Sequence, residues 1–335
     1  MSRSARSHFS PGRSGILALL LTSVFSMQSA QGHEYTSLIK AKKYAEVERA
    51  VSSKLASNAN DADALLARID LILIETKATR FDEGVKIAEQ CIAGNPKNSE
   101  CHEALGNVLG ARAEKGGMMP GISSIGKIRD SYKKAIELDP RNFIAASSLM
   151  SFYLEVPGFL GGSNSKAKEL ILETKKLSPE VAKLLQAKFD LKDGDMEKAR
   201  TGALSVDASA TPAAAQLQSA ILVEIGLALI KEKKFSDAEK VFREMIQRYP
   251  DSSAAYLGLG RSLQEQGKLK EALPQLEKSL SIDATAAVLY RLGKTWQALG
   301  DKNKAIASFE KALAFTPLLS PKARADAEEQ LKTLK

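Results

Sequence analysis

The feature that most constrains the fold is a pattern of small residues that recurs at a nearly constant interval. Glycine occupies one position of the pattern, at Gly226, Gly260 and Gly293, and alanine another, at Ala238, Ala272 and Ala305. An interval of about 34 residues indicates an array in which each unit is one supersecondary element stacked on its neighbours. The chain is therefore expected to be a repeat protein.

Within each unit the residue types are those that a pair of packed helices requires. Gly226 and Ala238 are small enough to let two antiparallel helices approach closely, and Leu229 and Phe242 fill the seam with the next pair. Pro250 cannot continue a helix and marks the end of the unit. Ala, Leu, Lys and Glu dominate the composition and aromatic residues make up only 6%, which favours helices over strands.

These positions resemble the tetratricopeptide repeat. The matching residues are Ile225-Gly226, Ala238, Phe242 and Pro250 in one unit, Leu259-Gly260 and Ala272 in the next, and Leu292-Gly293, Trp296, Ala305, Phe309 and Pro317 in the third. The resemblance implies an all-α fold, a right-handed α-solenoid of stacked antiparallel helix pairs. Weaker forms of the pattern extend the array to about eight units, from His33 to Thr316.

The same pattern predicts the organisation of the chain. We expect a signal peptide over residues 1–32, irregular repeats with two Gly- and Pro-rich loop insertions over 33–206, regular repeats over 213–319, and a capping helix over 320–335. The Ala-, Ser- and Thr-rich segment 207–212 separates the irregular front from the regular back. Charged residues on the last helix suit a cap that faces water.

The segment 1–32 has the features of an export signal. Arg3, Arg6 and Arg13 precede an apolar run of about 12 residues from Ile16 to Met27, and cleavage is expected after Gly32. A retained membrane anchor is the alternative, but the run is shorter than the roughly 20 residues that span a bilayer. With no cysteine at the cleavage region and no later segment expected to span, we predict a periplasmic or secreted bacterial protein.

The two cysteines, Cys91 and Cys101, fall late in one expected helix and early in the next. An oxidising compartment would permit them to form a disulfide across the short turn between the helices. Two small buried thiols are an equally good interpretation. Sequence separation does not decide between them, because a disulfide depends on the distance between the Cα atoms.

The two insertions fall at equivalent points of consecutive units, so we expect them to emerge from one edge of the array. Their tips offer Met118 and Met119 in the first loop and Phe159 and Leu160 in the second. Apolar loop tips often mark a partner site. The alternative is that these side chains fold back and fill the seam between helices.

The resemblance also places a second candidate surface, because the first helix of each pair lines the concave face of a tetratricopeptide array. The residues expected near that face in the last two units are Arg261, Gln264, Tyr290, Arg291, Lys294 and Gln297. Positive charge beside amides and a phenol suits an acidic or carboxylate-bearing peptide. Solvation of an amphipathic helix is the competing explanation, and Glu100, Glu103 and Asn107 make the front half of the groove acidic.

Catalysis, metal binding and cofactor binding find no support in the sequence. The three histidines are scattered, and we find no zinc-ligand spacing, nucleophile elbow or phosphate-binding glycine loop. Without the leader, 45 basic residues oppose 40 acidic ones, too small a surplus to indicate nucleic-acid binding. We therefore expect a non-catalytic scaffold for a protein or peptide partner, in envelope assembly or secretion. The alternative is an accessory protein that binds anionic envelope polysaccharide or lipid.

Overall fold

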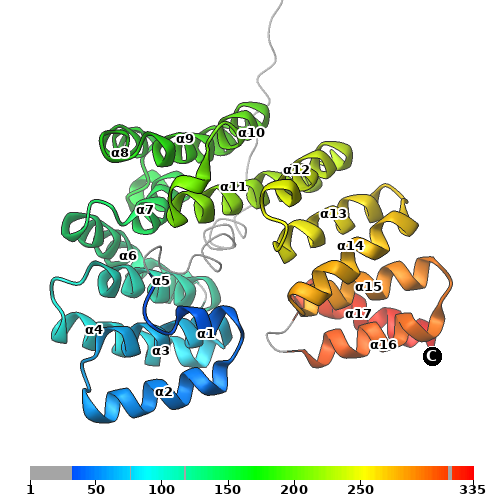
Figure 1. Ribbon diagram of the computed structural model, residues 1–335, viewed down its shortest axis with the longest axis horizontal. Helices are drawn as coiled ribbons and strands as arrows, with labels where there is room; N and C mark the ends of the chain where they lie inside the picture. The colour runs from blue at the N-terminus through cyan, green and yellow to red at the C-terminus, as the bar shows by residue number, and fades with distance from the viewer. Residues whose placement is uncertain (1–31, 76, 117, 316–318) are drawn as a thin grey trace, which may run out of the picture. The chain divides into compact units, whose positions relative to one another are not determined.

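The computed structural model describes residues 32–75, 77–116, 118–315 and 319–335, so the expected leader, apart from Gly32, lies outside the described residues. Those residues form helices and connecting turns without a strand, which confirms the all-α prediction. The chain divides into two compact units that meet between Pro179 and Glu180. Figure 1 shows consecutive antiparallel helices stacked within each unit.

The described part of unit 1 contains four helix pairs, in which the first member of the first pair is a single short turn. Its helices are α1 (Thr36–Lys40), α2 (Tyr44–Ser57), α3 (Ala62–Glu75), α4 (Phe81–Gly94), α5 (Ser99–Gly116), α6 (Met118–Leu138), α7 (Phe143–Glu155) and α8 (Asn164–Leu177), with the 3₁₀ turns η2 (Ala78–Arg80) and η3 (Gly158–Leu160).

The described part of unit 2 contains four more pairs and a terminal helix. Its helices are α9 (Pro179–Asp193), α10 (Met196–Leu204), α11 (Pro212–Lys231), α12 (Phe235–Arg248), α13 (Ser253–Glu265), α14 (Leu269–Ile282), α15 (Ala286–Ala298), α16 (Lys302–Ala314) and α17 (Pro321–Leu334), with η4 (Ala208–Ala210) before α11. Helix α17 lies where the capping helix was predicted.

Phe242 on α12 shows why the repeat alternates glycine with a bulky residue. A Cβ atom added at Gly226 on α11 would fall 2.4 Å from the ring Cζ, and one added at Gly258 on α13 would fall 2.3 Å from the ring. The phenyl group is fully buried and fits between glycines of two consecutive pairs. Phe309 lies against Gly293 of its own helix pair in the same way as Phe242 lies against Gly226. Close packing of this kind leaves no room for a methyl group.

The boundary between the units lies earlier than the expected division at residues 207–212. Gln218 on α11 donates from its amide to the carbonyl oxygens of Ala203 and Val206, at 2.7 and 2.8 Å. Lys188 on α9 pairs with Glu224 on α11 at 2.9 Å. These bonds attach α9 and α10 to α11, so the segment 207–212 lies inside unit 2.

The first expected loop insertion is helical in the structure. Helices α5 and α6 contain 18 and 21 residues, whereas α7 and α8 contain 13 and 14. Helices α5 and α6 together contain 39 residues against 27 in α7 and α8, so the inserted residues lengthen both helices of this pair. Val108, Leu109 and Ile125 are buried. The prediction that the first Gly- and Pro-rich insertion forms a loop was therefore wrong.

Candidate binding surfaces

The six residues predicted on the concave face lie on two neighbouring helices, α13 and α15. The Gln264 amide donates to the Arg291 carbonyl oxygen at 3.3 Å and to Thr295 Oγ1 at 3.1 Å. The Arg291 guanidinium in turn donates to Gln264 Oε1 at 2.9 Å and to Glu265 Oε1 at 3.0 Å. This part of the surface is therefore a cross-linked contact between two helices.

Three of the predicted residues contact the terminal helix. Tyr290 donates its hydroxyl hydrogen to Asp326 Oδ2 on α17, and Lys294 Nζ lies 3.5 Å from the same oxygen. Gln297 donates to Gln330 Oε1 at 2.7 Å. Burial, followed by the hydrogen bond to Asp326, raises the pKa of Tyr290 to about 12. Their polar groups thus fix α17 in place, a role that the repeat pattern did not reveal.

Arg261 differs from the other five residues. Its Nε atom is buried and has no hydrogen-bond partner, and its guanidinium forms no ion pair with a residue that the structure describes. Burial, and then the neighbouring charge of Arg291, lower the pKa of Arg261. The charge of Glu265 partly opposes this effect, and an added carboxylate would supply further compensating charge to the partly buried guanidinium.

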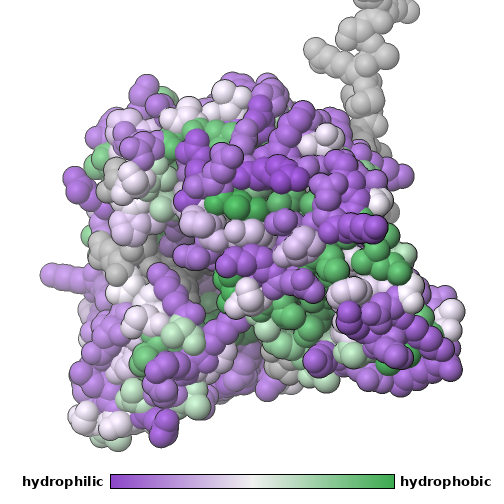
Figure 2. All heavy atoms as spheres, turned by 45° about the vertical axis from the view of Figure 1, so that its right-hand side comes forward, coloured by the Kyte–Doolittle hydropathy of each residue, from purple (hydrophilic) through white to green (hydrophobic). Residues whose placement is uncertain are grey.

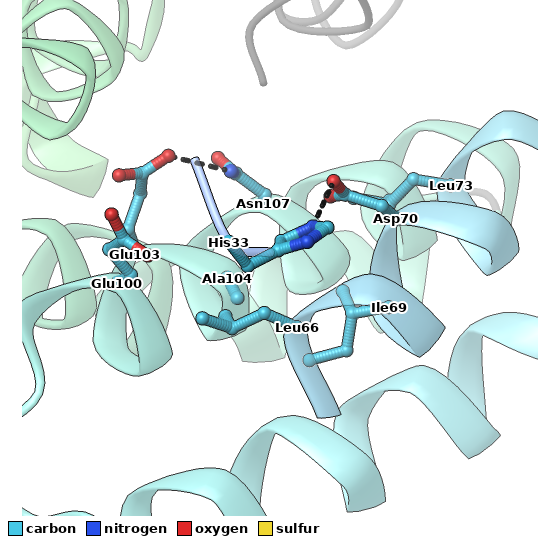
Figure 3. A pocket seen from close by; sticks show the side chains of 9 residues that line it. All are labelled: His33, Leu66, Ile69, Asp70, Leu73, Glu100, Glu103, Ala104 and Asn107. Carbon is cyan, nitrogen blue, oxygen red and sulfur yellow. Dashed lines mark hydrogen bonds and ion pairs between the residues drawn. The ribbon is translucent and has the colours of Figure 1, made fainter. Parts of the chain in front are cut away.

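Unit 1 carries a small acidic pocket between α3 and α5 (Figure 3). His33 enters it from the segment before α1, and its Nε2 atom lies 3.1 Å from Asp70 Oδ2. The Nδ1 atom of the same ring accepts the Tyr35 backbone N–H at 3.2 Å. Because Nδ1 accepts, Nε2 carries the hydrogen and donates it to Asp70. The pocket is lined by His33, Leu66, Ile69, Asp70, Leu73, Glu100, Glu103, Ala104 and Asn107.

Glu103 is the most deeply buried carboxylate of this pocket. The Asn142 and Asn107 amides donate to its two oxygens at 2.9 and 3.3 Å, and Tyr132 donates to Asn107 Oδ1 at 2.9 Å. Burial raises the pKa of Glu103 to about 7, an effect that the charge of Glu100 adds to and the two amides oppose. The predicted groove residues Glu100, Glu103 and Asn107 are thus brought together, with two of them forming a buried polar network.

The four predicted loop-tip residues lie in different environments. Met118 and Met119 belong to the first turn of α6, and their side chains lie outside the described residues. Phe159, in η3, is 87% exposed, whereas Leu160 is half-buried. The turn containing η3 packs near Arg129, about 16 Å along α6 from Met118 at 1.5 Å per residue. Because the side chains of Met118 and Met119 lie outside the described residues, the composite surface stays a prediction.

Cys91 on α4 and Cys101 on α5 form a disulfide in the structure, with their Cα atoms 5.6 Å apart. Both residues are fully buried. Among the residues that the structure describes, no three His, Cys, Asp or Glu side chains come together as a group for a metal ion. The prediction that no segment after the leader is apolar enough to span a membrane was wrong, because helix α11 is long and apolar enough by length and composition. Ten of its residues are buried, as in a core helix.

Charged and polar side chains cover most of the face drawn in Figure 2, and apolar side chains show between them as separate patches. This distribution is typical of stacked amphipathic helices, which bury one face and solvate the other. Ion pairs one helical turn apart, such as Arg243 with Glu239 at 2.8 Å and Arg324 with Glu328 at 3.0 Å, contribute to the polar surface. Pairs of this kind add little stability.

Comparison with protein-family models gives three matches. Two models described as tetratricopeptide repeat match residues 229–292 and 286–319. A third, described as regulator of microtubule dynamics protein 1-3, matches residues 24–159. No curated protein sequence matches the chain.

Two solved structures align with most of this chain. The crystal structure of yeast Tom70 superposes with a TM-score of 0.50 at 16% identity, over 83% of this chain and 60% of that one. This chain thus spans about 60% of the length of Tom70. A tetratricopeptide repeat protein from Parabacteroides merdae ATCC 43184 covers 88% of this chain and 99% of its own, with a TM-score of 0.41 at 15% identity.

The regular helix pairs of unit 2 and the family models agree on the same residues. Residues 229–319 are matched as tetratricopeptide repeats, and they contain the close contacts of Phe242 and Phe309 with glycines. Residues 229–319 therefore form tetratricopeptide repeats, as the spacing of their small and bulky residues predicted.

Proposed function

We propose that this chain is an exported scaffold that holds an acidic segment of a partner protein on the concave side of unit 2. Tetratricopeptide repeat proteins are generally scaffolds for protein interactions. The observation that carries the proposal is Arg261, a partly buried guanidinium whose Nε atom lacks a hydrogen-bond partner. A carboxylate would supply a counter-charge at the accessible part of this guanidinium, and the neighbouring Gln264 and Arg291 are already held in place by their own hydrogen bonds.

Export is supported by two features. The leader combines three arginines with an apolar run too short to span a bilayer. The Cys91–Cys101 disulfide suits an oxidising compartment such as the bacterial periplasm. A role in envelope assembly or secretion follows from this location.

Peptide binding tests the site. Fluorescently labelled acidic peptides, with free and with amidated C-termini, are titrated with the protein and followed by anisotropy. Arg261→Gln is expected to weaken binding about tenfold, since a hydrogen bond to a charged group contributes about 1.5–3 kcal/mol. Arg243→Gln, which alters an exposed ion-paired residue on α12, is the control. Equal peptide affinity of the wild type, Arg261→Gln and Arg243→Gln would show that Arg261 does not bind the peptide.

A capture experiment separates the protein-binding function from its alternative. The wild-type chain and the Arg261→Gln variant are used side by side as bait in cell-envelope extract. A discrete protein retained by the wild type and lost by the variant supports the scaffold. Retention of anionic polymer without protein, abolished by salt, would support polysaccharide or lipid binding instead.

The exported form is identified from its N-terminus. Edman sequencing or intact mass of the chain recovered from the periplasm should give His33 as the first residue. A chain that keeps Met1 and stays with the cytoplasmic fraction would contradict export.

A further inference from the structure

Unit 1 has an open groove that is lined by residues of three consecutive helices. Helices α6 and α8 form its walls and α7 forms its floor, and its volume is about 600 Å³. The floor is apolar, with Ala146, Leu149 and Tyr153 contributed by α7. The groove lies entirely within unit 1 and is separate from the Arg261 surface.

The walls have an apolar lower part and a charged rim. On α6 the lining residues Lys133, Ile136 and Glu137 follow helical spacing, so they lie on one face of that helix. On α8, Leu170 and Leu177 lie seven residues apart and line the opposite wall, and Leu177 is 42% exposed. Protein interfaces commonly have this arrangement, in which an apolar centre is surrounded by a polar or charged rim.

Phe159 lies in the turn that joins α7 to α8, the helices that form the floor and one wall of this groove. The turn is fixed there because Ser163 N–H donates to the carbonyl oxygen of Tyr153, a floor residue, at 2.8 Å. Gly162 is required in the turn, since a Cβ atom at this position would fall 1.6 Å from the Val156 carbonyl oxygen. A well-defined turn thus holds a phenyl group 87% exposed to water.

The rim of the groove has no net charge. Three lysines and three glutamates line it, namely Lys133, Lys166, Lys176, Glu137, Glu169 and Glu173. A partner of strongly acidic or basic character would gain nothing from such a rim. Within one chain Lys176 already pairs with Glu173 at 2.7 Å, and Glu137 pairs with Lys134 at 2.8 Å. A second copy of the same rim, turned by a two-fold axis, brings further lysines opposite glutamates on both sides.

We infer that this chain self-associates through the groove, with Phe159 of each copy inserted into the groove of the other. The projecting ring and the cavity that accepts a ring lie side by side on one unit, which is what an isologous two-fold contact requires. A phenylalanine side chain buries about 150–250 Å² and serves as a central anchor of the contact. The inference is independent of the peptide site at Arg261.

Sedimentation velocity over a range of concentrations tests the inference, with the chain produced from its complete gene in an export-competent host. The wild type is expected to shift from monomer to dimer, and Phe159→Ser to weaken self-association at least tenfold. Leu172→Ser is the matched control, because Leu172 is 62% exposed on α8 but does not line the groove. A monomer at every concentration, or a Phe159→Ser variant that dimerises like wild type, would overturn the inference.

A second variant examines the groove itself. Leu177→Arg places a charge at an exposed position of the wall and is expected to weaken self-association as Phe159→Ser does. Arg261→Gln should leave it unchanged. A dimer insensitive to Leu177→Arg, or one lost in Arg261→Gln, would also contradict a contact through this groove.

Discussion

The Asn142 amide donates a 2.9 Å hydrogen bond to the carboxylate of Glu103, joining the start of α7 to α5. Asn142 also caps α7, because its Oδ1 atom accepts the Ala145 backbone N–H at 2.9 Å. One side chain thus begins a helix and solvates a buried carboxylate on the preceding pair. Neither Lys nor Arg is among the described residues that line the pocket, which makes Glu103 an unusual feature of the core.

Stability should depend on the protonation of Glu103. Since its pKa in the folded chain, about 7, lies above the ordinary value of 4.5, the folded state binds this proton more tightly than the unfolded chain. The stability contributed by the proton is complete below pH 4.5 and is lost as the pH rises through 7. Glu103→Gln should therefore raise the free energy of unfolding at pH 8 by on the order of 2 kcal/mol.

Urea denaturation at pH 5 and pH 8 measures this effect. The difference between the two pH values should be smaller in Glu103→Gln than in the wild type. Glu169→Gln, at an exposed position on α8, should preserve the wild-type difference. If Glu103→Gln were less stable than the wild type at pH 8, the hydrogen bonds from the Asn142 and Asn107 amides would depend on a charged carboxylate at Glu103.

The disulfide should contribute to the stability of unit 1. Cys91 and Cys101 are ten residues apart. Closing a loop of this size lowers the entropy of the unfolded chain, which adds about 3 kcal/mol to the free energy of unfolding. The double variant Cys91→Ala and Cys101→Ala is expected to lose roughly this much in urea denaturation. Thiol titration of the unfolded wild-type chain should find no free thiol, and two free thiols would exclude the disulfide.

Close helix contacts were predictable from the sequence because they depend on local spacing. Gly226 and Phe242 belong to one helix pair, formed by α11 and α12, and the steric fit between them recurs with the period of the array. The capping helix was predictable for a similar reason, since Pro321 at its first position and Ser320 before it are ordinary start signals.

Features that depend on distant partners were not predictable. Asp326 accepts the hydroxyl hydrogen of Tyr290, although the two residues are 36 positions apart and Asp326 lies outside the repeat pattern. The sequence therefore did not show that residues predicted on the concave face contact α17. Gly116 suggested a loop by its low helix propensity, but propensity is a weak signal against packing along an extended pair of helices. His33 and Asp70 are likewise far apart in sequence, and no motif connects them.

Two glycines of the chain should respond in opposite ways to the same substitution. Gly226→Ala is expected to cost about 1–3 kcal/mol, since its methyl group would overlap the fully buried ring of Phe242. At Gly126, in α6, an added Cβ meets nothing within 4 Å, so Gly126→Ala should gain up to about 1 kcal/mol from better helix propensity. Thermal denaturation of both variants measures the difference, and destabilisation of equal size would contradict the packing argument.

The terminal helix should depend on Asp326 more than on its other acidic residues. Asp326 accepts from Tyr290 and lies near Lys294, whereas Glu328 pairs with Arg324 on the same helix. Asp326→Ala leaves the half-buried hydroxyl of Tyr290 without its acceptor, a change that costs about 1–3 kcal/mol. The loss is expected to appear as local opening of α17, because the contacts removed are confined to α15 and α17. Hydrogen exchange should therefore speed up over α17 in Asp326→Ala and remain unchanged in Glu328→Ala, while exchange in α11 and α12 stays at the wild-type rate. Equal acceleration in both variants would mean that apolar contacts, rather than the Tyr290–Asp326 bond, hold α17 on the last repeat.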